Sequence, residues 1–448
     1  MTKPVLPQRI QEIVRAVSDA GGRALLVGGW VRDHLLGIES KDLDFEVFNL
    51  ELERLESVLR KFGKVQRVGK QFGVLRVQGL DVDFSLPRQD NKVGSGHRGF
   101  EIETDPTMSF QKAATRRDLT INSMGFDPLT HELLDPHGGQ SDLNAKELRA
   151  TSAEHFSEDP LRGLRAIQFA ARLKMKANAE LVELCSKLDL RELPKERFRT
   201  EFDKWFSRGL KPSLGLNLLF AANLHRHFPG LSSLRADAAT ALGTKLDAIA
   251  NLQNLKDGER ISLSLATMAL FFDATGNQAL QDSSPEASGP WHPSNRSESV
   301  GAAHLHFLGF IGQPLKIQEQ SMRWLHTFEW LISTSSPALS DGEIRRLATY
   351  LDKGQLSLVH WLDGAEAASI TDKDWLKHLR IRAASLSCLE SAQPDIVQGR
   401  DLLKRGLKAG PKFASILQTC RRIQDDEGLS DANELIDRVL LAKGEETL

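Results

Sequence analysis

A pair of glycines between an apolar run and a helical pattern constrains the fold of this chain more than any other feature. Leu25–Val27 have the composition of a short buried strand, and Trp30–Leu36 carry a helical pattern. Gly28 and Gly29 allow the backbone to turn tightly against a ligand. Backbone N–H groups and the positive end of the helix dipole would then face an anion, with Arg32 one turn into the helix. The pattern predicts a phosphate-binding turn.

The next segment predicts a strand with one acidic face. Acidic and apolar residues alternate from Asp42 to Phe48, and successive side chains of a strand point to opposite sides. Asp42 and Asp44 therefore share a face, about 6.5 to 7 Å apart along the strand. At that spacing both can bind one divalent cation or a pair of them.

A later hairpin offers a third acid. Val74–Val77 and Asp81–Leu86 read as its two strands, joined at Gln78-Gly79-Leu80. Asp83 shares a face with Asp81 and is the candidate that completes the metal site. Each signal alone is weak, because such short patterns are most often ordinary turns or solvated strand edges. Their order and spacing, however, are what two-metal nucleotidyl transfer requires.

Five ordered motifs resemble those of the class II tRNA nucleotidyltransferases, the CCA-adding enzymes, and of the related bacterial poly(A) polymerases. They are Gly28–Asp33, Asp42–Asp44, Arg116–Met124, Asp135–Asp142 and Glu158–Ala166. Two further stretches resemble the bacterial CCA-adding enzymes in particular, Gly94–Phe100 and Gly399–Leu403 with Gly406–Pro411. The similarity is dense over about residues 20–210, thin over 211–390, and present again in the tail.

The resemblance implies an α+β fold, with a polymerase-β-like nucleotidyltransferase head on a mixed sheet and all-α neck, body and tail domains. We expect the head at 1–140, the neck with its base-selecting helix at 141–215, the body at 216–390 and a tRNA-binding tail at 391–448. Helical periodicity supports this division; it is found at Ile10–Val17, Leu161–Leu173, Ala179–Leu188, Glu196–Phe206 and Leu214–Leu224. Gly276–Gly301, rich in Ser, Pro, Asn and Gly, predicts an exposed loop.

The resemblance also assigns roles in the transfer reaction. Asp42 and Asp44 would hold Mg2+, while Asp83 would bind the metal that activates the primer hydroxyl or accept its proton, two roles that the sequence leaves open. The phosphate-binding turn, Gly28 and Gly29 with Arg32, would grip the triphosphate. Arg117 would be a further nucleotide contact, and a solvated charged turn at Arg116-Arg117-Asp118 is the alternative.

Three residues are candidates for selecting the base. Asp159, Arg162 and Arg165 are spaced by three, which on a helix places them on one surface. Arg162 donates and Asp159 accepts hydrogen bonds, which complements the Watson–Crick edge of cytosine and, after a small shift, of adenine. The resemblance implies that they read the incoming base, and an intrahelical ion pair is the simpler, compatible alternative. The next position with this spacing is Gln168, where the family often has Arg. This difference weakens the case for a further cationic contact to the nucleotide.

Three other segments have two interpretations each. Asp135–Gly139 is a hinge between head and neck or a plain turn. The basic residues Lys404, Arg405, Lys408 and Lys412 contact tRNA phosphates or form a solvated turn. Leu263–Ala274 has no His-Asp pair, and Asp273 alone cannot form the metal site of the phosphohydrolase domain that some relatives carry. We expect no hydrolase activity there, although the helical fold of that domain could persist.

Length and composition limit the number of domains, the extent of any RNA-binding surface and the cellular location that we expect. The 448 residues, 40% hydrophobic, suffice for several domains, and a net charge of −2 confines any RNA site to a local patch. Three scattered cysteines, Cys185, Cys388 and Cys420, form neither a disulfide framework nor a zinc spacing, which suits a reducing cytoplasm. Met1–Ile10 carry no apolar core of the kind that a signal peptide has, and no uninterrupted apolar stretch approaches the ~20 residues that span a bilayer. We therefore expect a cytoplasmic protein with no membrane association and no evident obligate protein partner.

The favoured function is template-independent addition of C, C and A to the tRNA 3′ end from CTP and ATP with Mg2+, releasing diphosphate. A CC-only or A-only enzyme, or a poly(A) polymerase, would share the same active site. A non-catalytic tRNA-binding protein is the alternative from a different class. Such a protein would be expected to have lost Asp42 or Asp44, and the chain retains both.

Overall fold

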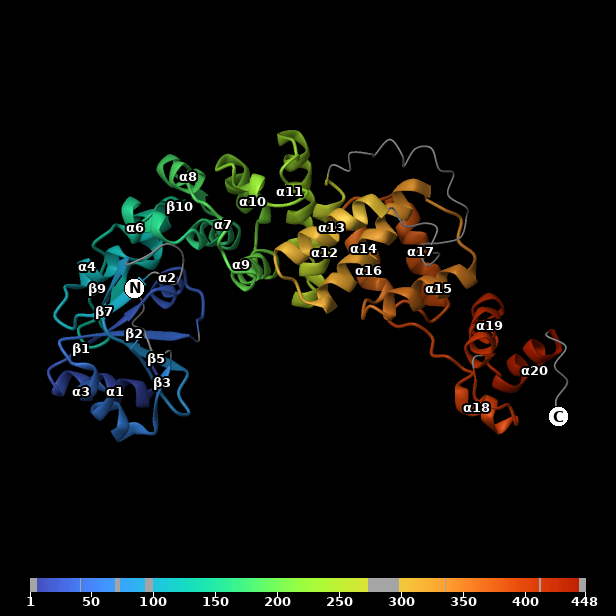
Figure 1. The fold of residues 1–448 in the computed structure, drawn as a ribbon, viewed down its shortest axis with the longest axis horizontal. Coiled ribbons are helices and arrows are strands. Elements are labelled where there is room, and N and C mark those ends of the chain that lie inside the picture. The colour runs from blue at the N-terminus through green and yellow to red at the C-terminus, as the bar shows by residue number, and fades with distance from the viewer. Residues whose placement is uncertain are drawn as a thin grey trace. The chain divides into compact units, whose positions relative to one another are not determined.

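The chain forms two compact units, Met1–His227 and Phe228–Leu448 (Figure 1). The computed structural model describes residues 6–40, 42–68, 73–92, 100–272, 298–334, 336–410 and 412–442. Within those ranges, no helix has both the length and the apolar composition that crossing a bilayer requires. The division into head, neck, body and tail stays a prediction.

A seven-stranded mixed sheet organises the first unit. Its strand order is β3-β4-β5-β2-β1-β8-β9, and the β2–β5 pair is parallel whereas the other neighbours are antiparallel. The bounds are β1 Arg23–Val27, β2 Leu43–Phe48, β3 Val65–Val68, β4 Val74–Val77, β5 Val82–Ser85, β8 Gly125–Phe126 and β9 Leu133–Leu134. The mixed sheet and the β4–β5 hairpin confirm the predictions from the sequence.

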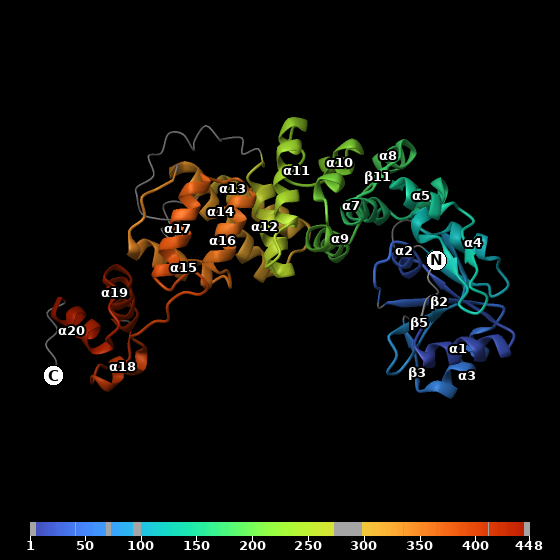
Figure 2. The same cartoon turned by 180° about the vertical axis from the view of Figure 1, so that it is seen from behind.

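Helices pack the apolar side of this sheet. The first, α1 (Gln8–Asp19), buries Ile10, Ile13, Val14 and Val17 as its periodicity predicts, and it packs against β1 and α3 (Leu52–Leu59) (Figure 2). The helix after the glycine turn is α2 (Gly29–Leu35). Two short strands, β6 (Arg88–Lys92) and β7 (Phe100–Thr104), pair apart from the main sheet. The predicted motif Gly94–Phe100 lies outside the described residues apart from Phe100.

Helices dominate the chain after β9. They are α5 Gly139–Ala145, α6 Ala153–Glu158, α7 Leu161–Leu173, α8 Ala179–Ser186, α9 Lys195–Arg208, α10 Pro212–Ala221 and η3 Leu224–His227. A parallel bridge of β10 (Glu147–Leu148) and β11 (Lys176–Ala177) joins them. Three short helices precede β9 in the sheet region: η1 Arg60–Phe62, α4 Phe110–Thr115 and η2 Thr120–Asn122. The predicted helix at Leu214–Leu224 ends early because Asn223 takes a left-handed conformation, φ 54°.

The turn at Asp135–Gly139 is tightly held. The Asp135 carboxylate accepts the N–H groups of Gly139 at 2.7 Å and of Gln140 at 2.9 Å. A Cβ at Gly139 would lie 2.3 Å from the carbonyl oxygen of Thr120, so the backbone passes too close for any other residue. The hinge stays a prediction.

The described part of the second unit is helical. Its elements are α11 Ala236–Ala250, α12 Asp257–Ala269, α13 Glu298–Phe310, α14 Leu315–Thr334, α15 Asp341–Asp352, α16 Leu358–Ala367, α17 Lys373–Ser385, α18 Gly399–Lys404, α19 Lys412–Glu427 and α20 Ala432–Ala442. The predicted loop Gly276–Gly301 lies outside the described residues up to 297. Its last four residues begin α13, so the loop prediction is wrong there; Glu298 suits the positive end of a helix.

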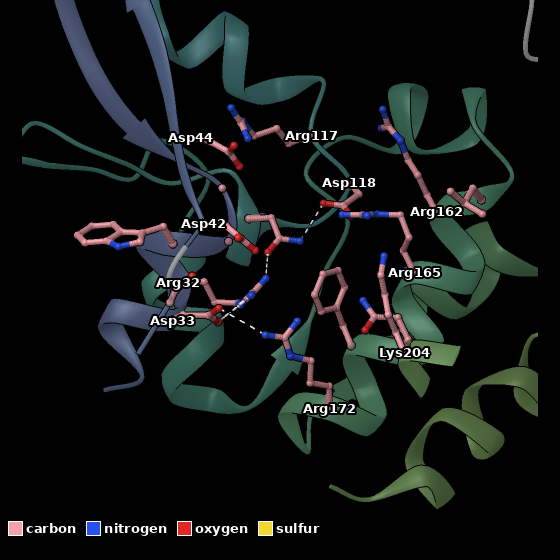
Figure 3. A pocket seen from close by; sticks show the side chains of 18 of the residues that line it. Arg32, Asp33, Asp42, Asp44, Arg117, Asp118, Arg162, Arg165, Arg172 and Lys204 are labelled. Carbon is pink, nitrogen blue, oxygen red and sulfur yellow. Dashed lines mark hydrogen bonds and ion pairs between the residues drawn. The ribbon is translucent and has the colours of Figure 1, made fainter. Parts of the chain in front are cut away.

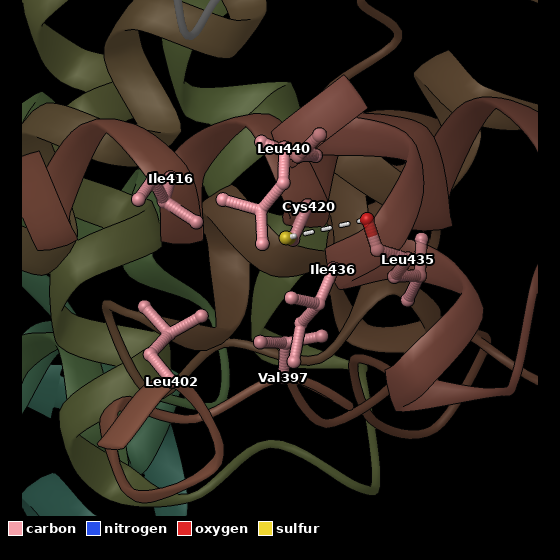
Figure 4. Packing of buried hydrophobic residues seen from close by; sticks show 8 residues of the cluster. Val397, Leu402, Ile416, Cys420, Leu435, Ile436 and Leu440 are labelled. Atoms are coloured by element: carbon pink, nitrogen blue, oxygen red, sulfur yellow. Dashed lines mark hydrogen bonds between the residues drawn. The ribbon is translucent and has the colours of Figure 1, made fainter. Parts of the chain in front are cut away.

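The last three helices share a core of their own. Buried apolar side chains from α18, α19 and α20 meet around the Cys420 thiol (Figure 4). The thiol donates to the carbonyl oxygen of Leu435 at 3.9 Å. The cluster consists of Val397, Leu402, Ile416, Cys420, Leu435, Ile436, Val439 and Leu440.

Candidate active site

The glycine turn between β1 and α2 depends on one of its two glycines. Gly28 precedes α2 with φ 71° and ψ −132°, a conformation that strains any L side chain. A Cβ there would also lie 3.2 Å from Nη1 of Arg117. Gly29 starts the helix, and a Cβ there would make an ordinary contact, 3.4 Å from Arg32. Gly28 thus brings the backbone of the turn against Arg117.

The Arg32 side chain is fixed in the wall of the site. It is 3% exposed and donates to Asp33 Oδ1 from Nε at 2.8 Å and to Asn122 Oδ1 from Nη1 at 2.5 Å. Its guanidinium also lies over the ring of Phe169, 5.0 Å from the centroid. Burial lowers the Arg32 pKa, and Asp33 counteracts this effect. Arg32 lines the cavity with its donors already bound to protein acceptors.

Two of the three candidate metal-site acids, Asp44 and Asp83, lie on neighbouring strands, and Asp42 directly precedes β2. Parallel pairing of β2 and β5 sets Asp44 directly beside Asp83, so the two side chains share a face. Desolvation and the nearby carboxylates of Asp83 and Asp42 raise the Asp44 pKa. Asp42 and Asp44 both line the cavity (Figure 3).

Asp83 differs from the other two acids in its partner. Arg76 binds both carboxylate oxygens of Asp83, at 2.6 and 2.8 Å. Among the described residues, no three His, Cys, Asp or Glu side chains are arranged around a metal position. The expected three-acid site is therefore not preformed, and Asp42 with Asp44 is the pair that faces the cavity.

Glu46 is a site residue that the sequence analysis missed. It follows Asp44 on the same face of β2 but is fully buried. It accepts from Arg116 Nη2 at 2.9 Å and from Arg117 Nη2 at 3.2 Å. Burial would raise the Glu46 pKa, yet the two arginines outweigh it and lower the pKa. Arg117 is thus held by a buried acid beside Gly28, and the solvated-turn alternative is wrong.

Of the three candidates for selecting the base, Asp159 does not lie on the predicted helix. Asp159 is not helical, with φ −119° and ψ 104°, because the residue before Pro160 favours extended backbone. Its carboxylate accepts from Arg197 Nη2 of α9 at 2.9 Å, so the alternative of an ion pair within one helix is wrong. Arg162 of α7 instead donates to the carbonyl oxygen of Arg116 at 2.6 Å.

Asp118 ties α7 to the sheet region. It is 7% exposed and accepts from Arg165 Nε at 2.7 Å and from Asn122 Nδ2 at 3.0 Å. Arg165 and these hydrogen bonds outweigh burial and lower the Asp118 pKa. The ring of Phe169 lies beneath both Arg165, at 5.4 Å, and Arg32. The sequence analysis did not assign site roles to Asp118, Asn122 and Phe169. Asp118 and Asn122 stand within the Arg116–Met124 motif, but the arginines that they bind, Arg165 and Arg32, are 47 and 90 residues away in sequence.

All predicted site residues except Asp83 line one cavity of about 560 Å³ (Figure 3). Its walls carry more cations than acids, which suits an anionic ligand. The cationic side chains are Arg32, Arg116, Arg117, Arg162, Arg165, Arg172, Arg197, Lys204 and Arg208. The acidic ones are Asp33, Asp42, Asp44, Asp118 and Asp159.

Comparison with known proteins identifies relatives of this chain. Residues 24–149 match the family model of the poly A polymerase head domain. The Multifunctional CCA protein of Xylella fastidiosa (strain 9a5c) is 31% identical over 291 residues, which cover 62% of this chain and 67% of that protein. The Multifunctional CCA protein of Haemophilus influenzae (strain PittGG) is 39% identical over 186 residues, 40% of this chain and 43% of that one.

Solved structures share the fold along nearly the whole chain. The CCA-adding enzyme of Bacillus stearothermophilus in complex with CTP has a TM-score of 0.70 at 20% identity, and the match covers 98% of this chain and 100% of that one. The Thermotoga maritima CCA-adding enzyme complexed with tRNA_CCA has a TM-score of 0.60 at 17% identity, covering 98% and 96%. The head-domain match and the relatives at 31% identity or more agree with this fold. The chain therefore belongs to the class II bacterial CCA-adding enzymes, a family of nucleotidyltransferases.

Proposed function

We propose that this protein adds C, C and A in turn to the 3′ end of tRNA from CTP and ATP, releasing diphosphate at each step. One observation carries the proposal: the acid pair at the start of β2, Asp42 and Asp44, and the base-reading candidates next to the start of α7, Asp159 and Arg162, line the same cavity. The reaction needs charge stabilisation at the α-phosphate and recognition of the base within one nucleotide's length. The cavity offers both.

Nucleotidyltransferases of this type use divalent metal ions, and we propose Mg2+ here. The donor set fits, since carboxylate oxygens are the ligands that Mg2+ prefers. The raised Asp44 pKa also fits, because neighbouring carboxylates that repel one another gain from a shared cation. Asp42 and Asp44 would hold the ions, which stabilise the attacking and leaving oxygens when bound. Asp83 would join them only after leaving Arg76.

The other pocket residues would bind and orient the nucleotide. Gly28 and Gly29 would present backbone N–H groups to the triphosphate, beside the guanidinium of Arg117. Arg32 would attract the triphosphate through its positive charge from its position in the cavity wall. Asp159 and Arg162 would pair with the edge of cytosine or adenine, and their contacts to Arg197 and the Arg116 carbonyl would hold them ready.

The tRNA would be held by phosphate contacts from the last helices. Lys404 and Arg405 at the end of α18 lie near Lys408 on the exposed turn before α19. Such contacts give affinity without reading sequence. A cytoplasmic location would keep the buried thiols Cys185 and Cys388 reduced.

Extension of a tRNA that ends before the CCA tests the proposal. Labelled CTP and ATP are supplied separately and together with Mg2+, and the products are sequenced at their 3′ ends. We expect two C residues from CTP alone and one further A when ATP is present. Stopping after two C, adding A only to a CC end, or producing long A tails would each reject full CCA addition. Binding of tRNA with no incorporation would favour the non-catalytic alternative.

A further inference from the structure

Gln168 is a buried amide in the wall of the nucleotide cavity. It lies in α7, is 2% exposed and lines the cavity. No donor in the described part of the chain reaches its Oε1 atom. A buried acceptor is costly to leave unpaired, and native proteins rarely do so. The partner that this oxygen lacks can come from whatever fills the cavity.

The neighbouring side chains of α7 already have protein partners. Arg165 binds Asp118 at 2.7 Å, and Arg172 lies 3.5 Å from Asp33. Gln168 stands between these two arginines on the same helix face. A neutral amide there adds no charge to a wall that is already cationic. Its contribution is therefore a hydrogen bond to a ligand and not another attraction for phosphate.

The position of Gln168 along α7 indicates which part of a nucleotide it meets. It lies six residues after Arg162, about 9 Å further along the helix axis. If Asp159 and Arg162 read the base edge, the sugar and phosphates extend beyond them along the cavity. An acceptor oxygen gains nothing from ionised phosphate oxygens, which are acceptors too, whereas ribose hydroxyls can donate.

We propose that Oε1 of Gln168 accepts a hydrogen bond from a ribose hydroxyl of the incoming nucleotide. Gln168 is then a further specificity-determining residue, one that distinguishes ribonucleotides from deoxynucleotides. The inference rests on the proposed function, because it takes the cavity to hold CTP and ATP.

Addition of a single A to tRNA ending in CC tests this contact. The ratio of kcat/KM for ATP to that for 2′-deoxy-ATP, and likewise for 3′-deoxy-ATP, is measured in the wild-type protein and in Gln168→Met. Methionine has a similar length and no strong hydrogen-bonding atom. We expect the preference against one of the two analogues to fall on the order of tenfold, the effect of one lost hydrogen bond. The analogue affected identifies the hydroxyl.

Two further variants make the result specific. Gln168→Glu keeps an acceptor oxygen and should keep the preference, since any effect of its charge cancels in the ratio. Gln320→Met is the matched control. Gln320 in α14 is 4% exposed, and its Oε1 likewise has no hydrogen-bond partner among the described residues, but it belongs to the other unit. Its preference should equal that of the wild type.

The outcomes separate the inference from the proposed function. The contact would be overturned if Gln168→Met discriminated against both analogues as strongly as the wild type does. It would also be overturned if the wild type itself showed no preference for ATP over either analogue. If Gln168→Glu also lost its preference for ATP over the analogue, the assignment of Oε1 as the hydrogen-bond acceptor would be overturned. If the wild-type protein adds no A to the CC end, the proposed function fails, and the inference fails with it.

Discussion

The backbone conformation of single residues decides whether the phosphate-binding turn forms. Replacing Gly28 by Ala should lower the free energy of unfolding by about 1–3 kcal/mol, because its φ of 71° strains an L residue. The new Cβ would also press on Arg117 and reduce kcat/KM for CTP. Gly29→Ala is the control, since a Cβ there makes an ordinary contact. Chemical unfolding and single-turnover C addition measure both effects; equal behaviour of the two variants would contradict this account of the turn.

The buried charge of Glu46 should matter for both stability and nucleotide affinity. Glu46→Gln removes the acid that Arg116 and Arg117 share, leaving two part-buried cations uncompensated. We expect a loss of roughly 2–4 kcal/mol in unfolding free energy and a higher KM for CTP and ATP, because Arg117 is released. Glu51→Gln, at an exposed position before α3, should change neither. An unchanged KM in a folded Glu46→Gln protein would show that Glu46 does not position Arg117.

At the residue scale, the sequence predicted the features that depend only on neighbouring residues. The glycine turn and the alternating acids are readable because strand and turn periodicities act over a few residues. Glu46 could have been suspected, as the next acid on the face of Asp44. Its partners follow 70 residues later, and nothing in a single sequence couples such distant positions. Arg76 is a different case, because it lies only seven residues before Asp83 and faces it across the predicted hairpin; the sequence analysis could have paired the two.

At the scale of elements, periodicity predicted helices well and their ends less well. The bounds of α7, Leu161–Leu173, equal the predicted span. Spacing by three nevertheless misplaced Asp159 onto this helix, because Pro160 makes the preceding residue extended. The proline was visible in the sequence and was the available signal. Left-handed Asn223 shortened α10 in the same way, and Asn is a residue that adopts this conformation readily.

The helix α14 contains a buried acid that should make stability depend on pH. Glu329 is 9% exposed, and neither carboxylate oxygen has a hydrogen-bond partner in the described part of the chain. Burial raises its pKa from 4.5 to about 7. The folded state therefore binds a proton more tightly than the unfolded state. The resulting stability is fully present below pH 4.5 and is lost as the pH rises through 7.

Replacing Glu329 by Gln should remove this dependence. We expect the variant to be about 3 kcal/mol more stable than the wild type at pH 8 and nearly equal to it at pH 4. Burial also lowers the pKa of His304 to about 3, which gives the opposite slope. Comparing variant and wild type at each pH cancels that contribution. Glu319→Gln, exposed on the same helix, should match the wild type by calorimetry at both pH values; no gain for Glu329→Gln at pH 8 would refute the prediction.

At the scale of the whole molecule, the chemistry is concentrated in the first unit. Every residue that lines the cavity lies between Gly28 and Arg208, within Met1–His227. Hydrophobic periodicity predicted the change from mixed α/β to helical structure along the chain. The convergence of β2, the Arg116–Asn122 segment and α7 on one cavity followed from resemblance to a family and not from patterning. It depends on tertiary packing among segments far apart in sequence.

The most direct test of the central claim is C addition by Asp42→Asn and Asp44→Asn to a tRNA that lacks the CCA, measured in a single turnover together with tRNA binding. Both variants should bind tRNA like the wild type. Their incorporation rates should fall by about a thousandfold or more, because the acids that would hold the catalytic cations are lost. Asp81→Asn, an exposed acid beside β5, should react at the wild-type rate. Wild-type incorporation by Asp44→Asn would contradict the assignment of this cavity as the active site.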